Sequence, residues 1–303
     1  GAELDGALEL MAGGLDLAGV EQRVAEASAG VEQIFDYYLK GHDGWIESEK
    51  DGRQREMTYF RTREVMPQDG YDLELSIDLV IQNMIEEEFQ RIATELNPKS
   101  ASIIVSDVQS GYILGLGNYP SFNPNTFWTA EMDPLRNRAV TDVFEPGSTF
   151  KIVAASAALN EGIVTLDDIY DCSTTSVEHR GTRVSLPADS HPLGELTFAD
   201  VVIKSSNRGS ALIALQLGEQ RMYEYTRNFG FGEATDIHAN GEVGGVLHNV
   251  RSWRPITITR MAMGHSISAT ALQVHMAMSV IANDGVLMEP RLVRRIFNET
   301  GET

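Results

Sequence analysis

The feature that most constrains this chain is a serine placed directly before an apolar helix, with a lysine one helical turn later. Residues 144–151 read Phe-Glu-Pro-Gly-Ser-Thr-Phe-Lys, and residues 152–159 read Ile-Val-Ala-Ala-Ser-Ala-Ala-Leu. This pattern predicts a helix over residues 148–161 with small or apolar side chains on nearly every side, which should be buried centrally. Ser148 and Lys151 would then lie on one face at its start.

This pair of residues has the chemistry of nucleophilic catalysis. A serine hydroxyl needs a base to remove its proton, and Lys151 can be that base if burial and the helix dipole lower its pKa. The backbone N–H of Ser148 could donate to a developing oxyanion. The alternative is an N-cap serine followed by a surface lysine. No other Ser-x-x-Lys occurs in the sequence, and so apolar a helix rarely carries an unpaired lysine, so we favour the catalytic interpretation.

A second motif, Ser-x-Asn, lies at residues 205–207, between helices predicted at 197–203 and 208–217. Ser-x-x-Lys, Ser-x-Asn and Lys-Thr-Gly together mark penicillin-binding proteins and serine β-lactamases. In that arrangement Ser205 would relay a proton between Lys151 and the leaving group, and Asn207 would bind the substrate backbone. Alone, the motif would read as a plain interhelical loop. Another Ser-x-Asn at residues 121–123 lies in a Pro/Asn-rich loop, where we interpret it as turn chemistry.

Longer stretches of the sequence resemble class B penicillin-binding proteins, and the division-specific branch more than the elongation-specific one. The matching segments are residues 118–125, 136–148, 204–209, 229–232 and 263–273. Residues 30–41 and 51–53 are similar to the end of the membrane-proximal pedestal domain of that family. These landmarks occur in family order along most of the chain.

The resemblance implies a serine-type peptidoglycan D,D-transpeptidase that cross-links stem peptides ending in D-Ala-D-Ala during septal wall synthesis. Ser148 would form the acyl-enzyme, β-lactams would acylate the same residue, and no metal or organic cofactor would be required. The resemblance also implies catalysis outside the cytoplasm and a membrane anchor, an apolar helix of about 20 residues encoded before Gly1. A polytopic glycan polymerase and other division proteins would be its partners.

One departure from the family pattern is that the sequence contains no Lys-Thr-Gly or Lys-Ser-Gly. We expect a fragment truncated before the strand that carries this motif, and one that lacks full activity by itself. Two alternatives stay open. The first is a β-lactamase or D,D-carboxypeptidase, which shares Ser148, Lys151, Ser205 and Asn207. The second is a non-catalytic scaffold of the division machinery with a degenerate site.

The predicted fold is α+β, a penicillin-binding-protein-like domain in which helices pack on an antiparallel sheet beside an all-helical part. The turn at residues 67–70 divides the chain into a pedestal part (1–70) and a transpeptidase domain (71–303). Besides the helices named above, we predict helices near 31–39, 79–96 (capped by Asp78) and 270–283. Strands are predicted at 71–77 and 286–297, with a hairpin over 101–116.

Composition excludes some classes of function. The net charge of −20 argues against nucleic acid or anionic lipid as a partner, because both bind positive surfaces. Cys172 is the only cysteine, without a nearby cationic residue in sequence, so we expect a buried or half-buried thiol rather than a nucleophile. The seven histidines form no metal-binding motif.

Overall fold

The computed structural model describes residues 30–53, 55–298 and 300–301, so residues 1–29 of the predicted pedestal part lie outside the described chain. Its α-helices are α3 (Gly30–Leu39), α4 (Leu79–Leu96), α5 (Arg138–Thr141), α6 (Lys151–Asn160), α7 (Phe198–Ile203), α8 (Asn207–Leu217), α9 (Glu219–Asn228), α10 (Thr257–Met261) and α11 (Ala271–Ala282). Its 3-10 turns are η2 (Thr58–Phe60), η3 (Pro124–Thr129), η4 (Gly147–Phe150) and η5 (Val250–Ser252).

Its strands are β1 (Trp45–Glu47), β2 (Glu49–Lys50), β3 (Glu56–Met57), β4 (Arg63–Val65), β5 (Asp72–Leu75), β6 (Ala101–Ser106), β7 (Ile113–Tyr119), β8 (Val143–Phe144), β9 (Ile169–Asp171), β10 (Ser176–His179), β11 (Thr182–Ser185), β12 (Glu195–Thr197), β13 (Ala269–Thr270) and β14 (Val293–Phe297). These strands pair antiparallel in two-stranded sheets. Helices pack against them, which confirms the predicted α+β class.

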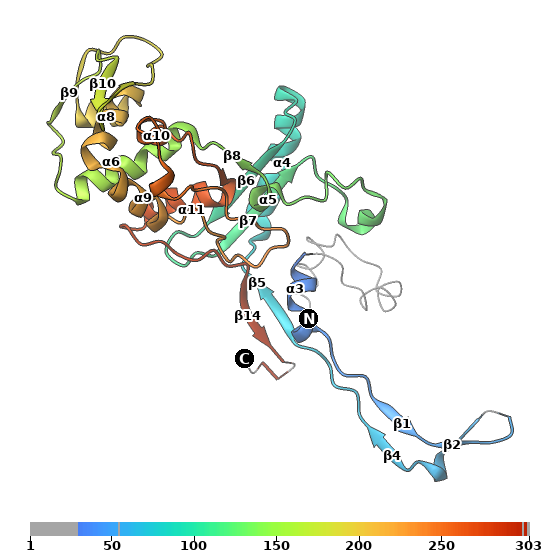
Figure 1. Ribbon diagram of the computed structural model, residues 1–303. Coiled ribbons are helices and arrows are strands. Elements are labelled where there is room, and N and C mark those ends of the chain that lie inside the picture. Colours follow the sequence, from blue (N-terminus) through green and yellow to red (C-terminus); the bar gives the residue numbers. More distant parts are fainter. Residues whose placement is uncertain (1–29, 54, 299, 302–303) are drawn as a thin grey trace.

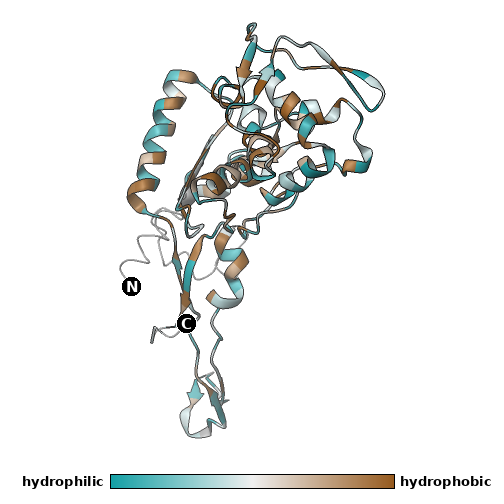
Figure 2. Cartoon of the chain, turned by 90° about the vertical axis from the view of Figure 1, so that its left-hand side faces the viewer, coloured by the Kyte–Doolittle hydropathy of each residue, from teal (hydrophilic) through white to brown (hydrophobic). Residues whose placement is uncertain are grey.

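Residues 30–70 form a helix and a thin arm that projects from the rest of the molecule (Figure 1). The helix predicted near residues 31–39 is confirmed as α3. In the arm β1 pairs with β4 and β2 with β3, and every residue of β1 and β4 is exposed. Hydrophobic residues are sparser in the arm than in the compact part above it (Figure 2). The arm therefore contributes little to the hydrophobic core.

Where the arm meets the compact part, β5 pairs with β14 from the far end of the chain (Figure 1). The strand predicted over 71–77 is confirmed at its centre. The strand predicted over 286–297 is wrong in its first half, because β14 covers only Val293–Phe297 and Arg291 before it makes an isolated bridge to Tyr112. The apolar pattern before it reflects packing against other elements instead: Leu287 lies beside the loop at Gly230, where a Cβ would come within 3.3 Å of its Cδ2, and Met288 packs against the cluster that contains Ile113 and Leu272.

The predicted hairpin is confirmed as β6 and β7, and α4 packs across one face of it. The Asp78 side chain caps α4 as predicted, by accepting from the backbone N–H groups of Val80 and Ile81. The helix comes so close that a Cβ built on Gly117 would lie 2.6 Å from the Phe89 ring and 2.7 Å from Cγ2 of Ile85. Glycine in β7 thus permits the close approach of the helix.

The other face of the hairpin packs against α5 and α11. Here buried residues from β7, α5 and α11 form one apolar cluster: Ile113, Val140, Leu272 and Met276, joined by Ile237. The helix predicted at 270–283 is confirmed as α11, which begins with a capping box between Thr270 and Gln273. This layer connects the sheet to the helical part of the molecule.

The helical part is built around α6, whose Val153, Ala154, Ala157 and Ala158 are at most 1% exposed. The small side chains let α8 and α9 pack closely on one side, while α7 and β9 pack near its end. The central burial predicted for this helix is confirmed, as are the helices at 197–203 and 208–217. Helices α5, α9 and α10 were not predicted.

We predict that Gly117→Ala destabilises the protein by about 1–3 kcal/mol, because the added methyl overpacks the contact between α4 and β7. Gly52→Ala is the matched control, since Gly52 lies in an exposed turn and a Cβ there meets nothing within 4 Å. Urea unfolding of both variants measures the difference. Equal stabilities would contradict the tight packing of α4 on the hairpin.

Candidate active site

Ser148 lies in a short turn before α6 rather than within an α-helix. The helix predicted from residue 148 begins as the 3-10 turn η4, and α6 starts only at Lys151. Gly147 has a φ of +60°, a left-handed conformation that glycine adopts without steric cost. The Thr149 hydroxyl closes the turn by donating to the Pro146 carbonyl at 2.7 Å. The Ser148 side chain is exposed. We call residues 145–150 the serine turn.

A loop after α10 supports the serine turn from one side. The Gly147 N–H donates to the Gly264 carbonyl at 3.2 Å, and the Glu145 carboxylate accepts from the Ser266 N–H at 3.0 Å. Gly264 has a φ of +77°, and a Cβ on it would lie 2.1 Å from the Gly147 carbonyl oxygen. Only glycine fits this position, because any side chain would displace the backbone that precedes Ser148.

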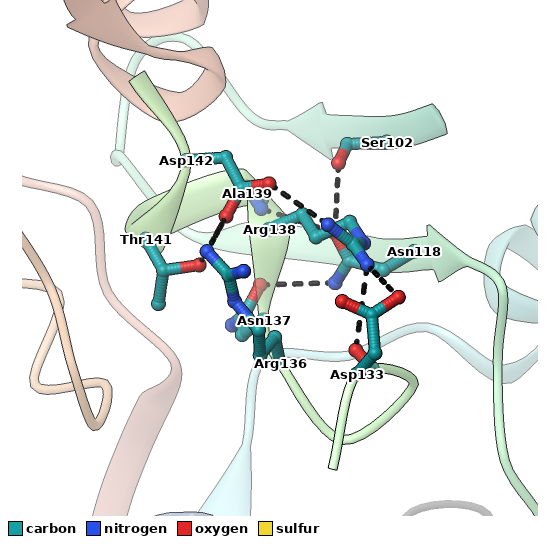
Figure 3. Close-up of polar contacts among 9 residues, drawn as sticks. All are labelled: Ser102, Asn118, Asp133, Arg136, Asn137, Arg138, Ala139, Thr141 and Asp142. Carbon is teal, nitrogen blue, oxygen red and sulfur yellow. Dashed lines mark hydrogen bonds and ion pairs between the residues drawn. The ribbon is translucent and has the colours of Figure 1, made fainter. Parts of the chain in front are cut away.

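On another side, α5 leads into the serine turn through β8 and is fixed to the sheet by side-chain hydrogen bonds (Figure 3). Asn118 of β7 is the centre of this network. Its Oδ1 accepts from the Ser102 hydroxyl at 2.7 Å and from the Ala139 N–H at 3.0 Å. Its Nδ2 donates to Oδ1 of Asn137 at 3.0 Å. One amide therefore ties both strands of the hairpin to the start of α5.

Ion pairs complete the attachment of α5 (Figure 3). The Arg138 side chain, only 11% exposed, donates to Asp142 at 2.9 Å and to Asp133 at 2.5 Å. Arg136 donates to the other oxygen of Asp142 at 2.5 Å. A solvent-open pair such as Arg136–Asp142 stabilises little by itself. Together with the pairs of the largely buried Arg138, it fixes the direction in which the chain leaves α5.

Lys151 is buried, with 6% of its surface exposed. Its Nζ donates to the backbone carbonyl of Ser205 at 2.5 Å, to the Ser205 hydroxyl at 2.9 Å and to Oδ1 of Asn207 at 2.7 Å. The structure thus brings together three of the four predicted site residues across more than 50 positions of sequence. The fourth, Ser148, lies one turn before Lys151 with its side chain open to solvent.

The electrostatic environment of Lys151 suits a base. Burial lowers the pKa of its amine, because removing the ammonium from water disfavours the charged form, while the nearby Asp189 carboxylate raises the pKa and partly opposes burial. A lysine of lowered pKa supplies more neutral amine near neutral pH than an exposed lysine does. The predicted direction of the shift is therefore confirmed.

The turn between α7 and α8 presents the oxygens that Lys151 contacts. Ser205 occupies the left-handed region with a φ of +53°, an uncommon conformation for a serine. Ser206 caps α8, where its hydroxyl accepts from the Gly209 N–H at 3.0 Å. The Asn207 side chain uses its Nδ2 to donate to the Ala188 carbonyl at 2.8 Å, which leaves Oδ1 directed at Lys151.

Sequence reasoning missed Gly264, Asn118 and Asp189, which support the site from other elements. Asn118 and Gly264 lie in segments that resemble the family, but a single sequence gives no reason to select them. Asp189 lies in a loop with no motif of its own. Cys172 is fully buried, and burial raises the pKa of its thiol, which agrees with the interpretation of a structural cysteine.

Among the residues that the structure describes, there is neither a metal-binding cluster nor a membrane-spanning helix. Their His, Cys, Asp and Glu side chains form no group of three or more that could hold a metal ion. None of their helices combines the length and the apolar character needed to cross a membrane.

Residues 101–303 match the penicillin-binding protein transpeptidase domain family. The chain is 30% identical over 284 residues to stage V sporulation protein D of Bacillus subtilis, covering 92% of this chain and 43% of that protein. It is 32% identical over 246 residues to the probable peptidoglycan D,D-transpeptidase PenA of Neisseria gonorrhoeae, covering 78% of this chain and 42% of that protein.

A solved structure of penicillin-binding protein 3 from Mycobacterium tuberculosis, complexed with ampicillin, is similar with a TM-score of 0.77. It is 29% identical, and the match covers 90% of this chain and 57% of that one. The chain therefore belongs to the penicillin-binding protein transpeptidase family, as the sequence predicted. It spans about two fifths of the length of the two curated relatives.

We predict that Gly264→Ala destabilises the protein more than Gly162→Ala does. Both glycines have positive φ, near +77° and +62°, so both variants carry a backbone penalty of about 1–2 kcal/mol. A Cβ on Gly162 meets nothing within 4 Å, whereas one on Gly264 strikes the serine turn and adds about 1–3 kcal/mol. Chemical unfolding measures both. Equal losses would show that the two backbones are not in tight contact.

Proposed function

We propose that this chain is the catalytic part of a serine-type peptidoglycan D,D-transpeptidase. The observation that carries the proposal is the buried Lys151, held against Ser205 and Asn207 one turn beyond an exposed Ser148. A buried amine of lowered pKa beside a serine is the arrangement that activates a hydroxyl for acyl transfer. The name of one curated relative, a probable peptidoglycan D,D-transpeptidase, supports the same chemistry.

In the acylation step, Oγ of Ser148 attacks the carbonyl of the penultimate D-alanine of a stem peptide. The hydroxyl proton passes to the neutral amine of Lys151 as the new C–O bond forms. The peptide C–N bond then breaks, and the terminal D-alanine leaves with a proton delivered through the Ser205 hydroxyl, which lies 2.9 Å from the amine. The Ser148 backbone N–H would stabilise the oxyanion.

In the second step, an amine from a neighbouring stem peptide attacks the ester at Ser148. The new peptide bond is the cross-link; the attacking amine gives up one proton, which passes through Lys151 to the serine oxygen as the C–O bond breaks. A β-lactam enters the same first step because its strained amide replaces the D-Ala-D-Ala bond. Proton transfers between these side chains suffice, so the proposal requires no cofactor.

The role proposed for Asn207 requires a small rearrangement. To hydrogen-bond a substrate backbone, its amide would exchange the bond that Nδ2 now makes to the Ala188 carbonyl. Its Oδ1 could keep the contact with Lys151 during this exchange. Asn207 would then connect the base to the bound peptide.

The biological setting is also a proposal, and it rests on resemblance to the division-specific branch of the family. We place the catalytic part outside the cytoplasm, with residues 1–70 as the end of a pedestal that leads to a membrane anchor. A glycan polymerase of the division machinery would be the partner. Both the partner and the lipid-linked precursor would be held at the membrane, which raises their effective concentration. The gene sequence upstream of Gly1 tests the anchor. A gene that encodes no apolar membrane-spanning helix there would contradict this placement.

We predict that a fluorescent penicillin labels the full-length protein covalently at Ser148 and that Ser148→Ala abolishes the label. Ser121→Ala is the control, because Ser121 belongs to the other Ser-x-Asn sequence and should label like wild type. Gel fluorescence and peptide mass mapping measure the result. Labelling that persists without Ser148 would refute the nucleophile, and rapid hydrolysis of the acyl-enzyme would favour a β-lactamase or carboxypeptidase.

We predict that Lys151→Arg lowers the acylation rate by at least about 10²-fold, because a guanidinium stays protonated and cannot accept the serine proton. Lys204→Arg is the matched control. Lys204 is exposed beside the Ser-x-Asn turn and lies 3.9 Å from Asp200, so arginine should be tolerated there. Stopped-flow acylation measures both variants. A wild-type rate in Lys151→Arg would exclude Lys151 as the base.

A further inference from the structure

The Asp189 carboxylate, in the loop between β11 and β12, holds the start of α8. It accepts from the Ser206 hydroxyl at 3.0 Å, from the Asn207 N–H at 2.5 Å and, more weakly, from the Arg208 N–H at 3.4 Å. Its side chain is only partly exposed. One acidic group therefore binds three consecutive residues, of which the middle one is Asn207.

The start of α8 needs such a partner. The first N–H groups of a helix have no acceptor within the helix, and the helix dipole favours a negative charge there. Asp189 fulfils both requirements and at the same time fixes where the Asn207 backbone lies. The next loop residue on its N-terminal side contributes too, because the Ala188 carbonyl accepts from Nδ2 of Asn207 at 2.8 Å. Residues 188 and 189 thus orient both the backbone and the side chain of Asn207.

The contacts of Asp189 with the start of α8 extend through Asn207 to Lys151, the proposed base. Oδ1 of Asn207 lies 2.7 Å from Nζ of Lys151, and Ser205, which precedes the Asp189-bound residues, supplies two more oxygens. A displacement of α8 would move these acceptors away from the amine together. Catalytic rates are sensitive to displacements of this kind, since about 1 Å can cost about 10²-fold.

We propose that Asp189 is a positioning residue for acylation, which anchors the Ser205–Asn207 turn against Lys151 and sets the charge that its amine faces. The inference rests on the proposed function, because acylation is the step it concerns. Asp189 acts through the turn and its charge and is not placed in contact with substrate.

The charged groups around Lys151 define the electrostatic part of the proposal. Asp189 faces the amine from the β11–β12 loop. On the α7–α8 side, Lys204 lies 3.9 Å from Asp200, and the Arg208 guanidinium donates to the Cys172 carbonyl at 3.1 Å. Since the Asp189 charge favours the ammonium, its removal should let Lys151 lose its proton at lower pH. The acid limb of the acylation profile should move in that direction.

The test compares Asp189→Asn with Asp107→Asn in the full-length protein. Asp107 is a matched control because its carboxylate also accepts from one serine hydroxyl and two backbone N–H groups, in the turn between β6 and β7. The rate of acylation by a fluorescent penicillin is measured against pH, and urea unfolding reports the fold. For Asp189→Asn we expect about a tenfold lower plateau and an acid limb at lower pH. Asp107→Asn should show neither change.

Asp189→Glu separates charge from position. It restores the negative charge but lengthens the side chain, so the limb should return to the wild-type pH while the plateau stays low. An Asp189→Asn profile that coincides with that of Asp107→Asn would overturn the inference, although the proposed function would stand. If Asp189→Asn does not fold, a Glu variant with a displaced limb overturns it. If neither variant folds, the role is purely structural and the inference is wrong. A wild-type protein that takes no label would overturn the proposed function itself.

Discussion

The burial of the Lys151 amine is the constraint on which the rest of the site depends. Moving an ammonium from water into a protein interior costs several kcal/mol unless other polar groups compensate or the group loses its proton. Both effects operate here. Three oxygens of the α7–α8 turn accept hydrogen bonds from the amine, and burial lowers its pKa. Because α6 lies at the centre of the helical part, Lys151 at its start lies in the interior. The oxygens that surround its amine come from a distant part of the chain, the α7–α8 turn.

The serine turn is also held in place, by a backbone contact and by side-chain hydrogen bonds. The backbone contact between Gly147 and Gly264 leaves no room for a side chain. Asn118, which also accepts from Ser102 of β6, ties α5 to the sheet through two hydrogen bonds. These supports come from segments on both sides of Ser148 in sequence. Ser148 itself makes no comparable contribution to packing and remains exposed. In the proposed mechanism, a nucleophile on such a well-supported turn is preorganised for attack and keeps its access to substrate.

Several structural predictions were correct because they rested on short-range physics. The cap at Asp78, the hairpin of β6 and β7 and the helix α11 depend on residues within a few positions of one another. The strand predicted over 286–297 failed in its first half because an apolar alternation does not say what it packs against. Here Leu287 meets a loop, and a strand needs a partner along its whole length. Helices α5, α9 and α10 were missed because α9 is rich in polar residues and the other two are short.

The sequence by itself identified the family and the candidate residues for the proposed chemistry. The Ser-x-x-Lys motif identified Ser148 and Lys151, because helix geometry fixes the spacing of residues within one turn. The downstream Ser-x-Asn motif identified Ser205 and Asn207. Only the tertiary structure decided which atoms meet. It placed the Lys151 amine against Ser205 and Asn207, put Ser148 in a 3-10 turn, and brought Asp189 to the start of α8. The reason is that contacts between residues far apart in sequence depend on how helices pack, and local pattern carries no information about that packing.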